Sequence, residues 1–293
     1  MTRTLFGGIE AGGTKFVLAV GSSPTEITAT HTIPTREPDE TLAEALAWFE
    51  TQGSLQSLGI ASFGPVELDS RSSKWGHILK TPKPGWSDCD VAGFFSRNLS
   101  VPVGFETDVN GAALGEYHYG AGEGAASLTY VTVGTGIGGG TIIEGRLLHG
   151  AGHPELGHIF PRRDAADRDF EGACPFHGDC LEGLASGPAI LARWGSTLSE
   201  LQLNHEAHER IAQYIAQMCH SIFAAMATET IVLGGGVMKT PGLLEQIVRQ
   251  TAEIDAGYLP RRSDRRIVAP SLGDRAGLVG AMLIAKAQAR AGI

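Results

Sequence analysis

The chain has 293 residues and a formal net charge of −9, a length that suits two lobes around one cleft or one large domain. An apolar content of 42% and a charged content of 19% are typical of globular proteins and exclude a largely disordered chain. The acidic balance argues against nucleic-acid binding, because the dense basic run at residues 261–266 is best interpreted as a solvated loop.

Nothing in the sequence predicts export or membrane insertion. The first residues lead directly into an apolar strand pattern without the h-region of a signal peptide, and no apolar run is long enough to span a bilayer. We therefore expect a cytoplasmic protein with no membrane partner, whose four cysteines stay reduced. Cys89 and Cys219 are expected to be small buried residues, whereas Cys174 and Cys180 lie close together and need a separate explanation.

The first third of the chain alternates strand and helix patterns. In chain order the patterns predict strands at 5–10, 15–20, 26–33 and 58–62, a helix at 38–52, and a helix that is capped near Asp88 and passes through Phe95. A Gly-rich turn joins the first two strands, so the chain opens with a β-hairpin.

A second strand–turn–strand unit follows in the middle of the chain and suggests an internal repeat. The patterns there predict strands at 101–106, 128–133, 141–143 and 230–233, and helices at 110–117, 206–227 and 275–290. In the helix at 206–227, Ile211, Ile215, Met218 and Ile222 form a stripe that we expect to be buried. Because each half begins with a hairpin and then alternates, we expect an α/β fold of two lobes with mixed sheets.

Three Gly-rich clusters each follow a predicted strand, at residues 12–13, 134–140 and 234–236. Such loops can bind phosphate through backbone N–H groups, although each one alone is as simply explained by a tight turn. The first is not a P-loop, because a strand follows Lys15. The G-x-G-x-x-G match at Gly134 also precedes a strand rather than a helix, which disfavours an NAD-dependent oxidoreductase.

A Cys-x2-His-x2-Cys pattern occupies residues 174–180, and His158 lies 16 residues upstream of it. His158, Cys174, His177 and Cys180 would suit a closed tetrahedral zinc site. Two free thiols and two surface histidines are the competing interpretation, and His153 is a possible alternative ligand.

Five segments, taken together, resemble the motifs of the ROK family of sugar kinases and repressors, and they occur in the family's order over nearly the whole chain. They are residues 8–15, 107–116, 134–139, 153–158 and 233–237. The resemblance implies an actin/hexokinase-like (ribonuclease H-like) fold with two α/β lobes and an interlobe cleft. The expected N-terminal lobe is 1–108, completed by the helix at 275–293, and the larger lobe is 109–274, with a zinc-binding loop at 153–184.

The resemblance also implies roles for individual residues. Asp108 would be the general base, although an Asp at this place is as readily a helix N-cap. The ATP-binding residues would be Gly12, Gly13, Thr14, Lys15, Thr135, Gly136, Pro188, Gly234, Gly235, Gly236 and Val237. The sugar-binding residues would be Gly64, Thr107, Asp108, Glu155, His158 and Glu182. Mg²⁺ would bind mainly to the phosphates of ATP, with Glu10 and Asp108 in outer positions.

Several positions depart from the usual family pattern. Glu10 replaces an Asp, Thr107 replaces an Asn, and His177 would replace one of three Cys ligands of a structural zinc. Glu10, together with residues 62–66 and 81–86, resembles the fructokinase branch. The implied activity is ATP-dependent phosphorylation of D-fructose to fructose 6-phosphate, in a homodimer whose other partners are small molecules.

Two rival functions remain open at this stage. The first is a hexokinase or mannokinase with broader specificity. The second is a sugar-responsive regulator of the same family, which would carry an added N-terminal DNA-binding domain. The strand that leads into the first phosphate motif begins near residue 4, which leaves no room for such a domain and favours an enzyme.

Overall fold

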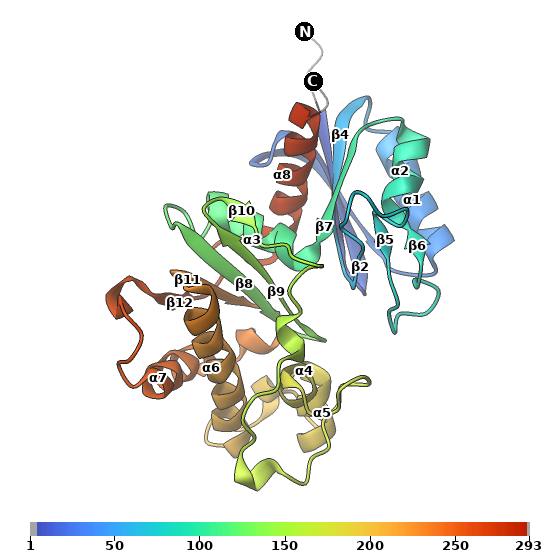
Figure 1. Ribbon diagram of the computed structural model, residues 1–293. Coiled ribbons are helices and arrows are strands. Elements are labelled where there is room, and N and C mark those ends of the chain that lie inside the picture. Colours follow the sequence, from blue (N-terminus) through green and yellow to red (C-terminus); the bar gives the residue numbers. More distant parts are fainter. Residues whose placement is uncertain (1–4, 292–293) are drawn as a thin grey trace. The chain divides into compact units, whose positions relative to one another are not determined.

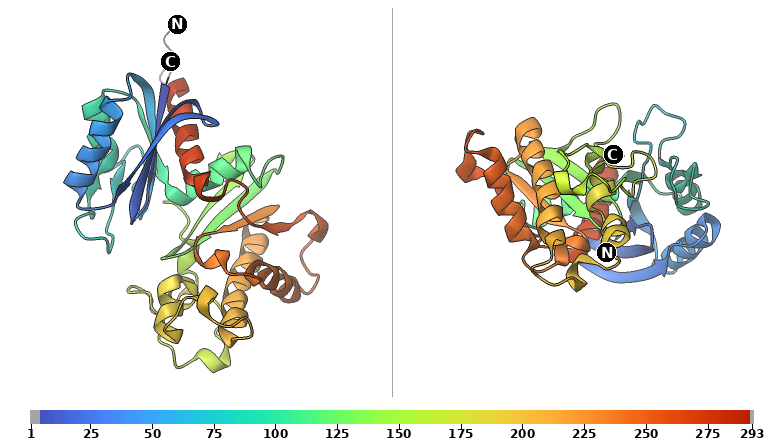
Figure 2. Two further views of the ribbon diagram at one scale, coloured as in Figure 1. Left: turned by 180° about the vertical axis from the view of Figure 1, so that it is seen from behind. Right: turned by 90° about the horizontal axis from the view of Figure 1, so that it is seen from below.

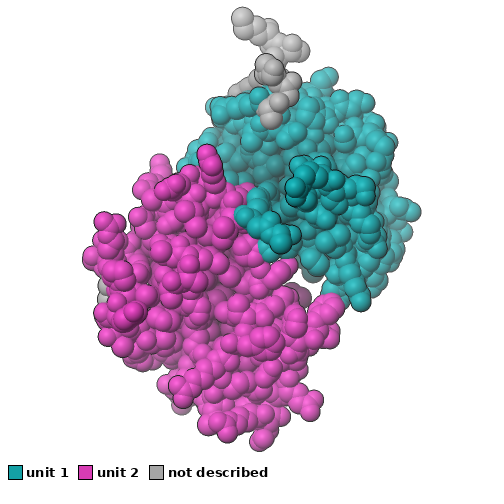
Figure 3. Space-filling view, in the orientation of Figure 1, with its two compact units in different colours: residues 1–119, 149–153, 274–293 teal, residues 120–148, 154–273 magenta. Residues whose placement is uncertain are grey.

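The computed structural model describes residues 5–291 and divides into two compact units (Figure 3). The first unit comprises residues 1–119, 149–153 and 274–293, and the second comprises residues 120–148 and 154–273. The first unit is therefore discontinuous in sequence, because its last helix follows the whole of the second unit. Among the described helices, none is both long enough and apolar enough to cross a membrane.

The first unit is built on a five-stranded mixed sheet in the order β3-β2-β1-β4-β7. The three strands β1, β2 and β3 pair antiparallel, whereas β1, β4 and β7 pair parallel. The strands are β1 (Leu5–Ala11), β2 (Lys15–Ser23), β3 (Glu26–Pro34), β4 (Leu55–Ser62) and β7 (Val103–Thr107).

Helices cover both faces of this sheet (Figure 1). α1 (Pro38–Glu50) and α2 (Val91–Leu99) bury Leu42, Phe49 and Phe95 against one face. α8 (Ala276–Ala291) covers the other face, where Met282 is fully buried, and α3 (Asp108–Tyr119) packs along α8. A short two-stranded sheet, β5 (His77–Ile78) with β6 (Cys89–Asp90), lies beside α2.

Glycines set the distance between α3 and α8. A Cβ atom built on Gly280 of α8 would overlap the backbone carbonyl of Gly111 in α3. Gly59 in β4 is restricted in the same way, since a Cβ there would overlap the backbone of α8 at Ala281 and Ala285. α8 therefore approaches both the sheet and α3 at backbone contact, and the start of α3 is fixed by this packing.

The second unit is built on a mixed sheet in the order β10-β9-β8-β11-β12. α6 and α7 pack against each other beside this sheet, as Figures 1 and 2 show. The elements are β8 (Ser127–Val133), β9 (Ile137–Ile143), β10 (Arg146–Leu147), β11 (Thr230–Gly234), β12 (Arg266–Val268), α4 (Leu181–Ala185), α5 (Gly187–Trp194), α6 (Glu206–Met226) and α7 (Leu243–Asp255). The predicted stripe on α6, from Ile211 to Ile222, is buried in the main core of this unit.

Most of the predicted elements are present within a few residues, and two differ for identifiable reasons. α2 begins at Val91 rather than near Asp88, because Asp90 accepts the N-cap hydrogen bond from the Gly93 N–H at 2.8 Å. β9 begins at Ile137 and not at residue 141, since Gly138 pairs with Thr132 in the sheet. The patterns did not predict α4, α7 or β12.

The close contact between α3 and α8 leads to a prediction about the stability of a variant. Gly280→Ala should destabilise the protein by about 2–3 kcal/mol, because the added methyl group has no space against the Gly111 carbonyl. The measurement is the free energy of unfolding from urea titration. Gly150→Ala is the matched control, since a Cβ there would meet nothing within 4 Å. Equal stability of the two variants would contradict the proposed backbone contact.

Candidate functional site

In the first unit, Asp108 lies at the junction between the end of β7 and the start of α3. Thr107 is buried, and its hydroxyl oxygen accepts the Asn110 N–H at 3.0 Å, which is the contact of a helix N-cap. The Asp108 carboxylate accepts the N–H of its neighbour Val109 at 2.8 Å. Because Thr107 makes the capping contact, helix capping does not account for Asp108. The helix N-terminus favours a negatively charged carboxylate at this place.

A second carboxylate, Glu10, comes from the end of β1 and interacts electrostatically with Asp108. Burial, and then the negative charge of Asp108, raise the pKa of Glu10 to about 7, although Lys15 and a hydrogen bond from the Leu278 N–H lower it. α8 can approach Glu10 because Gly277 has no side chain: a Cβ there would lie 2.6 Å from the Glu10 carboxyl carbon. The pair offers hard oxygen ligands beside a site that would receive Mg²⁺ with ATP.

The first Gly-rich turn connects β1 to β2 in the same unit. The Gly12 N–H donates to the Lys15 carbonyl at 2.9 Å, and the Thr35 hydroxyl donates to the Gly12 carbonyl at 2.7 Å. Thr14 and Lys15 are exposed, and a Cβ on Gly13 would meet nothing within 4 Å. The turn is thus held from behind by Thr35, while its outer side is open to a ligand.

Near this turn, Gly64 precedes Pro65 in a cis peptide bond. The Val66 N–H that follows donates to Nε2 of His153 at 3.3 Å. His153 therefore serves the segment after Gly64, and it is not a member of the metal-binding group described below.

A polar cluster next to Asp108 escaped the sequence analysis. Glu106 accepts a hydrogen bond from the Asn110 side-chain amide at 2.8 Å, and His149 Nε2 lies 3.1 Å from the Glu106 carboxylate. The hydrogen bond to Glu106 raises the pKa of His149. Glu106 and His149 lie outside the sequence motifs, and no local pattern joins position 149 to position 106.

In the second unit, the turn between β8 and β9 gathers several of the predicted ATP-binding residues. Gly134 donates its N–H to the Gly136 carbonyl at 2.9 Å, and its own carbonyl accepts the Gly187 N–H at 2.7 Å, directly before Pro188. Thr135, at the tip of the turn, is exposed. The structure therefore brings this turn and the start of α5 together.

The segment after β11 closes on the same turn. Gly235 has φ of +95°, and a Cβ there would overlap the Val133 backbone, so only glycine fits. A Cβ on Gly134 would lie 3.7 Å from the Gly236 nitrogen, and one on Gly187 would lie 4.0 Å from the Val237 side chain. Residues 234–237, the 134–136 turn and the start of α5 thus form one glycine-lined surface.

Glu182, which the sequence assigned to the sugar, lies directly behind this turn. Its Oε2 atom accepts the Ile137 N–H at 2.9 Å, and a Cβ on Gly136 would lie 2.7 Å from the same oxygen. Glu182 is therefore a structural partner of the turn, and its Oε1 atom is the one that could meet a ligand. Glu155 is exposed and precedes the 3-10 turn Leu156–His158.

Four side chains of the second unit converge to form a candidate metal centre. The ligand atoms of His158, Cys174, His177 and Cys180 all lie within 4.8 Å of one another. Nδ1 of His158 lies 3.2 Å from Nδ1 of His177 and 3.5 Å from Sγ of Cys180. Because His158 turns Nδ1 towards this group, its Nε2 atom remains for another partner. Burial raises the pKa of the Cys180 thiol to about 11, so a cation that binds there has to displace a proton.

The first unit thus carries a Gly-rich turn and two carboxylates, and the second unit carries a glycine-lined surface and four possible metal ligands. The sequence profile of the ROK family matches residues 6–288, and the chain belongs to this family. It is 47% identical to a fructokinase of Zymomonas mobilis, over 97% of each chain, and 46% identical to a putative fructokinase of Bacillus subtilis, over 96% of this chain and 95% of the relative.

The solved structure of a ROK hexokinase from Thermus thermophilus superposes with a TM-score of 0.80. It is 26% identical in sequence, and the match covers 99% of this chain and 100% of the hexokinase. The expected actin-like sugar kinase fold, with mixed sheets in an α/β arrangement, is thereby confirmed.

The Glu10 carboxyl makes a prediction about pH dependence. Its pKa of about 7 lies above the ordinary value of 4.5, so between these values the folded protein binds the proton more tightly than the unfolded chain. The contribution of Glu10 to stability should therefore fall as the pH rises from about 4.5 to 7 and stay constant above that. Glu10→Gln should remove this dependence. The difference in free energy of unfolding between Glu10→Gln and the unmodified protein should therefore increase by on the order of 2 kcal/mol from pH 5 to pH 8.

The measurement is the free energy of unfolding in urea at pH 5 and pH 8 for both proteins. Glu50→Gln, at an exposed position on α1, is the control and should leave the pH dependence unchanged. If Glu10→Gln shows the same pH dependence as the unmodified protein, the buried carboxyl is not protonated near neutral pH.

Proposed function

We propose that the chain is a fructokinase that transfers the γ-phosphate of ATP to the 6-hydroxyl of D-fructose. The observation that carries this proposal is the identity of 46–47% to two fructokinases over nearly the whole chain. The use of ATP and the four free cysteines support a cytoplasmic location.

Asp108 is the general base of the proposed reaction. It accepts the proton of the sugar hydroxyl while the oxygen of that hydroxyl meets the γ-phosphorus. The transition state of phosphoryl transfer is loose, so the position of the base and the neutralisation of charge matter more than its strength. Fixing Asp108 at the first turn of α3, behind the Thr107 cap, supplies that position.

The nucleotide is held mainly by backbone groups. Residues 12–15 and 134–136 offer N–H groups to the phosphates, and the exposed hydroxyls of Thr14 and Thr135 add to them. The glycine-lined surface of residues 234–237 with Pro188 receives the adenosine, where a side chain would clash. Mg²⁺, when bound with ATP, neutralises phosphate charge, and Glu10 and Asp108 are the carboxylates that would bind its water ligands.

The sugar is assigned to Gly64, Asp108, Glu155, His158 and the Oε1 atom of Glu182. Thr107 was expected to join this group. It is buried, and its hydroxyl oxygen already accepts the Asn110 N–H, so its main contribution is to fix the start of α3.

We assign the metal centre to a structural zinc ion. A tetrahedral site with Zn–N of about 2.0–2.1 Å and Zn–S of about 2.3 Å separates two nitrogens by about 3.3 Å and a nitrogen from a sulfur by about 3.5 Å. The observed separations of 3.2 Å between the two histidines and 3.5–3.9 Å between histidine and cysteine fit this geometry. Because all four donors come from the protein, the site has no open position for catalysis. Its role would be to fix the ring of His158, so that Nε2 faces the sugar.

A broader hexokinase or mannokinase activity and a regulatory role are the rival functions. A coupled assay of ADP release over a panel of hexoses separates them. The proposal expects fructose to give the highest kcat/KM. Equal kcat/KM for glucose or mannose would support the broader enzyme, and sugar binding without turnover would support the regulator.

The general base makes the first functional prediction. Asp108→Asn should fold and bind ATP, and its kcat should fall about 10²–10⁴-fold, because the group at the reacting oxygen can no longer accept a proton. Steady-state kinetics with fructose measure this effect. Asp69→Asn, at an ion pair with Arg71, is the control and should keep full activity. A kcat for Asp108→Asn within about threefold of normal, small against that expected loss, would remove Asp108 from the mechanism.

The zinc ion makes the second prediction. Protein purified without added metal should contain about one zinc per chain, and Cys174→Ser should lose it, whereas Cys89→Ser, outside the cluster, should retain it. Elemental analysis measures both. Partial depletion with a chelator should raise KM for fructose more than KM for ATP, after correction for the fraction of active enzyme. If KM for ATP rises first, the metal does not act through His158.

A further inference from the structure

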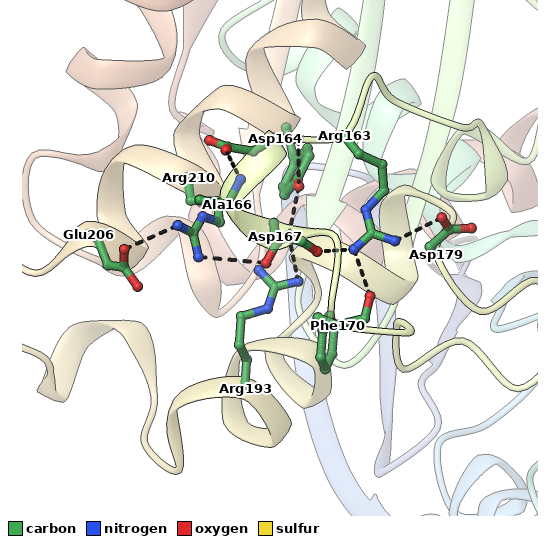
Figure 4. A network of polar contacts seen from close by, with 10 residues as sticks. Arg163, Asp164, Ala166, Asp167, Phe170, Asp179, Arg193, Glu206 and Arg210 are labelled. Atoms are coloured by element: carbon green, nitrogen blue, oxygen red, sulfur yellow. Dashed lines mark hydrogen bonds and ion pairs between the residues drawn. The ribbon is translucent and has the colours of Figure 1, made fainter.

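A buried ionic cluster holds the loop that supplies the metal ligands, and none of the motifs above includes it (Figure 4). Its centre is Asp167, which is 3% exposed and ends the 3-10 turn Ala165–Asp167. The Tyr214 hydroxyl donates to the Asp167 carboxylate at 2.7 Å, and Arg193 and Arg210 form ion pairs with it at 3.1 and 3.6 Å. Burial, followed by the hydrogen bond to Asp167, raises the pKa of Tyr214 to about 12, so this hydroxyl remains a donor.

The partners of Asp167 belong to two helices, which attach the loop to the rest of the unit. Arg193 comes from α5, while Arg210 and Tyr214 come from α6. The Arg193 guanidinium also stacks on the Phe170 ring at 4.1 Å, so the same arginine contacts the loop at a second place. In a buried setting such ion pairs define one geometry, because a displaced partner would leave an uncompensated charge.

Arg163 joins the two ends of the loop to each other. Its guanidinium donates to the backbone carbonyls of Asp167 and Phe170, and it pairs with the Asp179 carboxylate at 2.9 Å. Asp179 directly precedes the metal ligand Cys180. As Figure 4 shows, the guanidinium lies between Asp179 and the Asp167–Phe170 segment. Arg163 thus joins the Cys180 end of the loop to its first half, in addition to the backbone hydrogen bond from the Leu181 N–H to the Ile159 carbonyl at 2.8 Å.

Regular structure contributes little to this part of the chain. Between His158 and Cys180, the one helical element among the described residues is the turn that ends at Asp167. A loop without a strand or a long helix has few backbone hydrogen bonds to fix it, and ordering it when a metal binds would lower the affinity. The side-chain cluster can order this loop before the metal binds.

We propose that Arg163, Asp167 and Asp179 are positioning residues that hold the loop in its zinc-binding conformation before the metal binds. They thereby set how tightly zinc is retained and, through His158, how tightly fructose binds. The inference rests on the structural zinc assigned above. The cluster contains three arginines and three carboxylates, so its charges are balanced and it needs no further anion. They are Arg163, Arg193, Arg210, Asp167, Asp179 and Glu206.

The test uses Arg163→Gln and Asp179→Asn in the full chain. Asp167 is left unchanged, because its removal would leave Arg193 and Arg210 buried without a partner charge. Asp179 is partly exposed, so Asp179→Asn keeps the test available if Arg163→Gln does not fold. The control is Glu206→Gln, which removes an exposed partner of Arg210 on α6 and does not touch the loop.

The first measurement is zinc transfer from each purified protein to a chromogenic chelator. We expect a loss of zinc affinity of about 10–100-fold in both loop variants, which is typical when a residue that orients a metal ligand is removed. KM for fructose should rise several-fold while KM for ATP changes less than twofold, a split that a general loss of stability would not produce. Glu206→Gln should behave as the unmodified protein.

The second measurement is hydrogen exchange of residues 159–180 after zinc removal. The unmodified protein should keep protection in this loop, and both loop variants should lose it. If zinc affinity and loop protection are unchanged in both variants, the positioning role is refuted while the zinc assignment stands. If the unmodified protein contains no zinc, the zinc assignment itself fails, and this inference with it.

Discussion

Burial of the Glu10 carboxyl beside the negative charge of Asp108 is the electrostatic constraint on which this part of the first unit depends. Glu10 comes from the end of β1 and Asp108 from the start of α3, and burial of Glu10 leaves little solvent to screen the interaction between them. A proton or a cation has to neutralise part of this charge. The site is therefore best suited to a ligand that brings its own positive charge, and Mg²⁺ bound to ATP is such a ligand. The glycines of α3 and α8 serve this arrangement, since they allow the Leu278 N–H to reach Glu10.

In the second unit, many of the candidate site residues lie on irregular backbone, which has to be fixed by specific contacts. Its phosphate turn is held by contacts from behind, where Glu182 accepts the Ile137 N–H and Gly134 pairs with Gly187. Its loop of possible metal ligands is held by side chains, with Asp167 and its arginines on one side, and by backbone hydrogen bonds such as that from the Leu181 N–H to the Ile159 carbonyl at 2.8 Å. In both places contacts between polar groups hold the backbone, and several of these contacts join residues that are distant in sequence.

The parts of the site that the sequence predicted are those whose residues are close together in the chain. The four possible metal ligands fall within 23 residues, and the Gly-rich turns are runs of glycine after strands, so spacing and residue type were sufficient to single out these groups. Asp108 could be placed at the start of a helix, but only the structure showed that Thr107 makes the capping contact.

What escaped prediction depends on contacts between distant positions. The pairing of Glu106 with His149 and that of Asp167 with Arg193 and Arg210 have no periodicity and no fixed spacing. Glu182 was interpreted from its neighbours as a sugar ligand, although the structure also gives it the Ile137 N–H. In each case the tertiary fold selects the partner, and local propensity carries no information about it.

The discontinuity of the first unit has a consequence for how the protein is made. β1, β4 and β7 leave the ribosome early, but α8, which covers one face of their sheet, is synthesised only after residues 120–273. At a synthesis rate of about 5–20 residues per second, that face of the sheet is uncovered for roughly 10–30 s before α8 is made. During this time the groove that Gly59 keeps open for α8 is uncovered. That face therefore stays exposed until α8 emerges, and the second unit has time to fold before the first is complete.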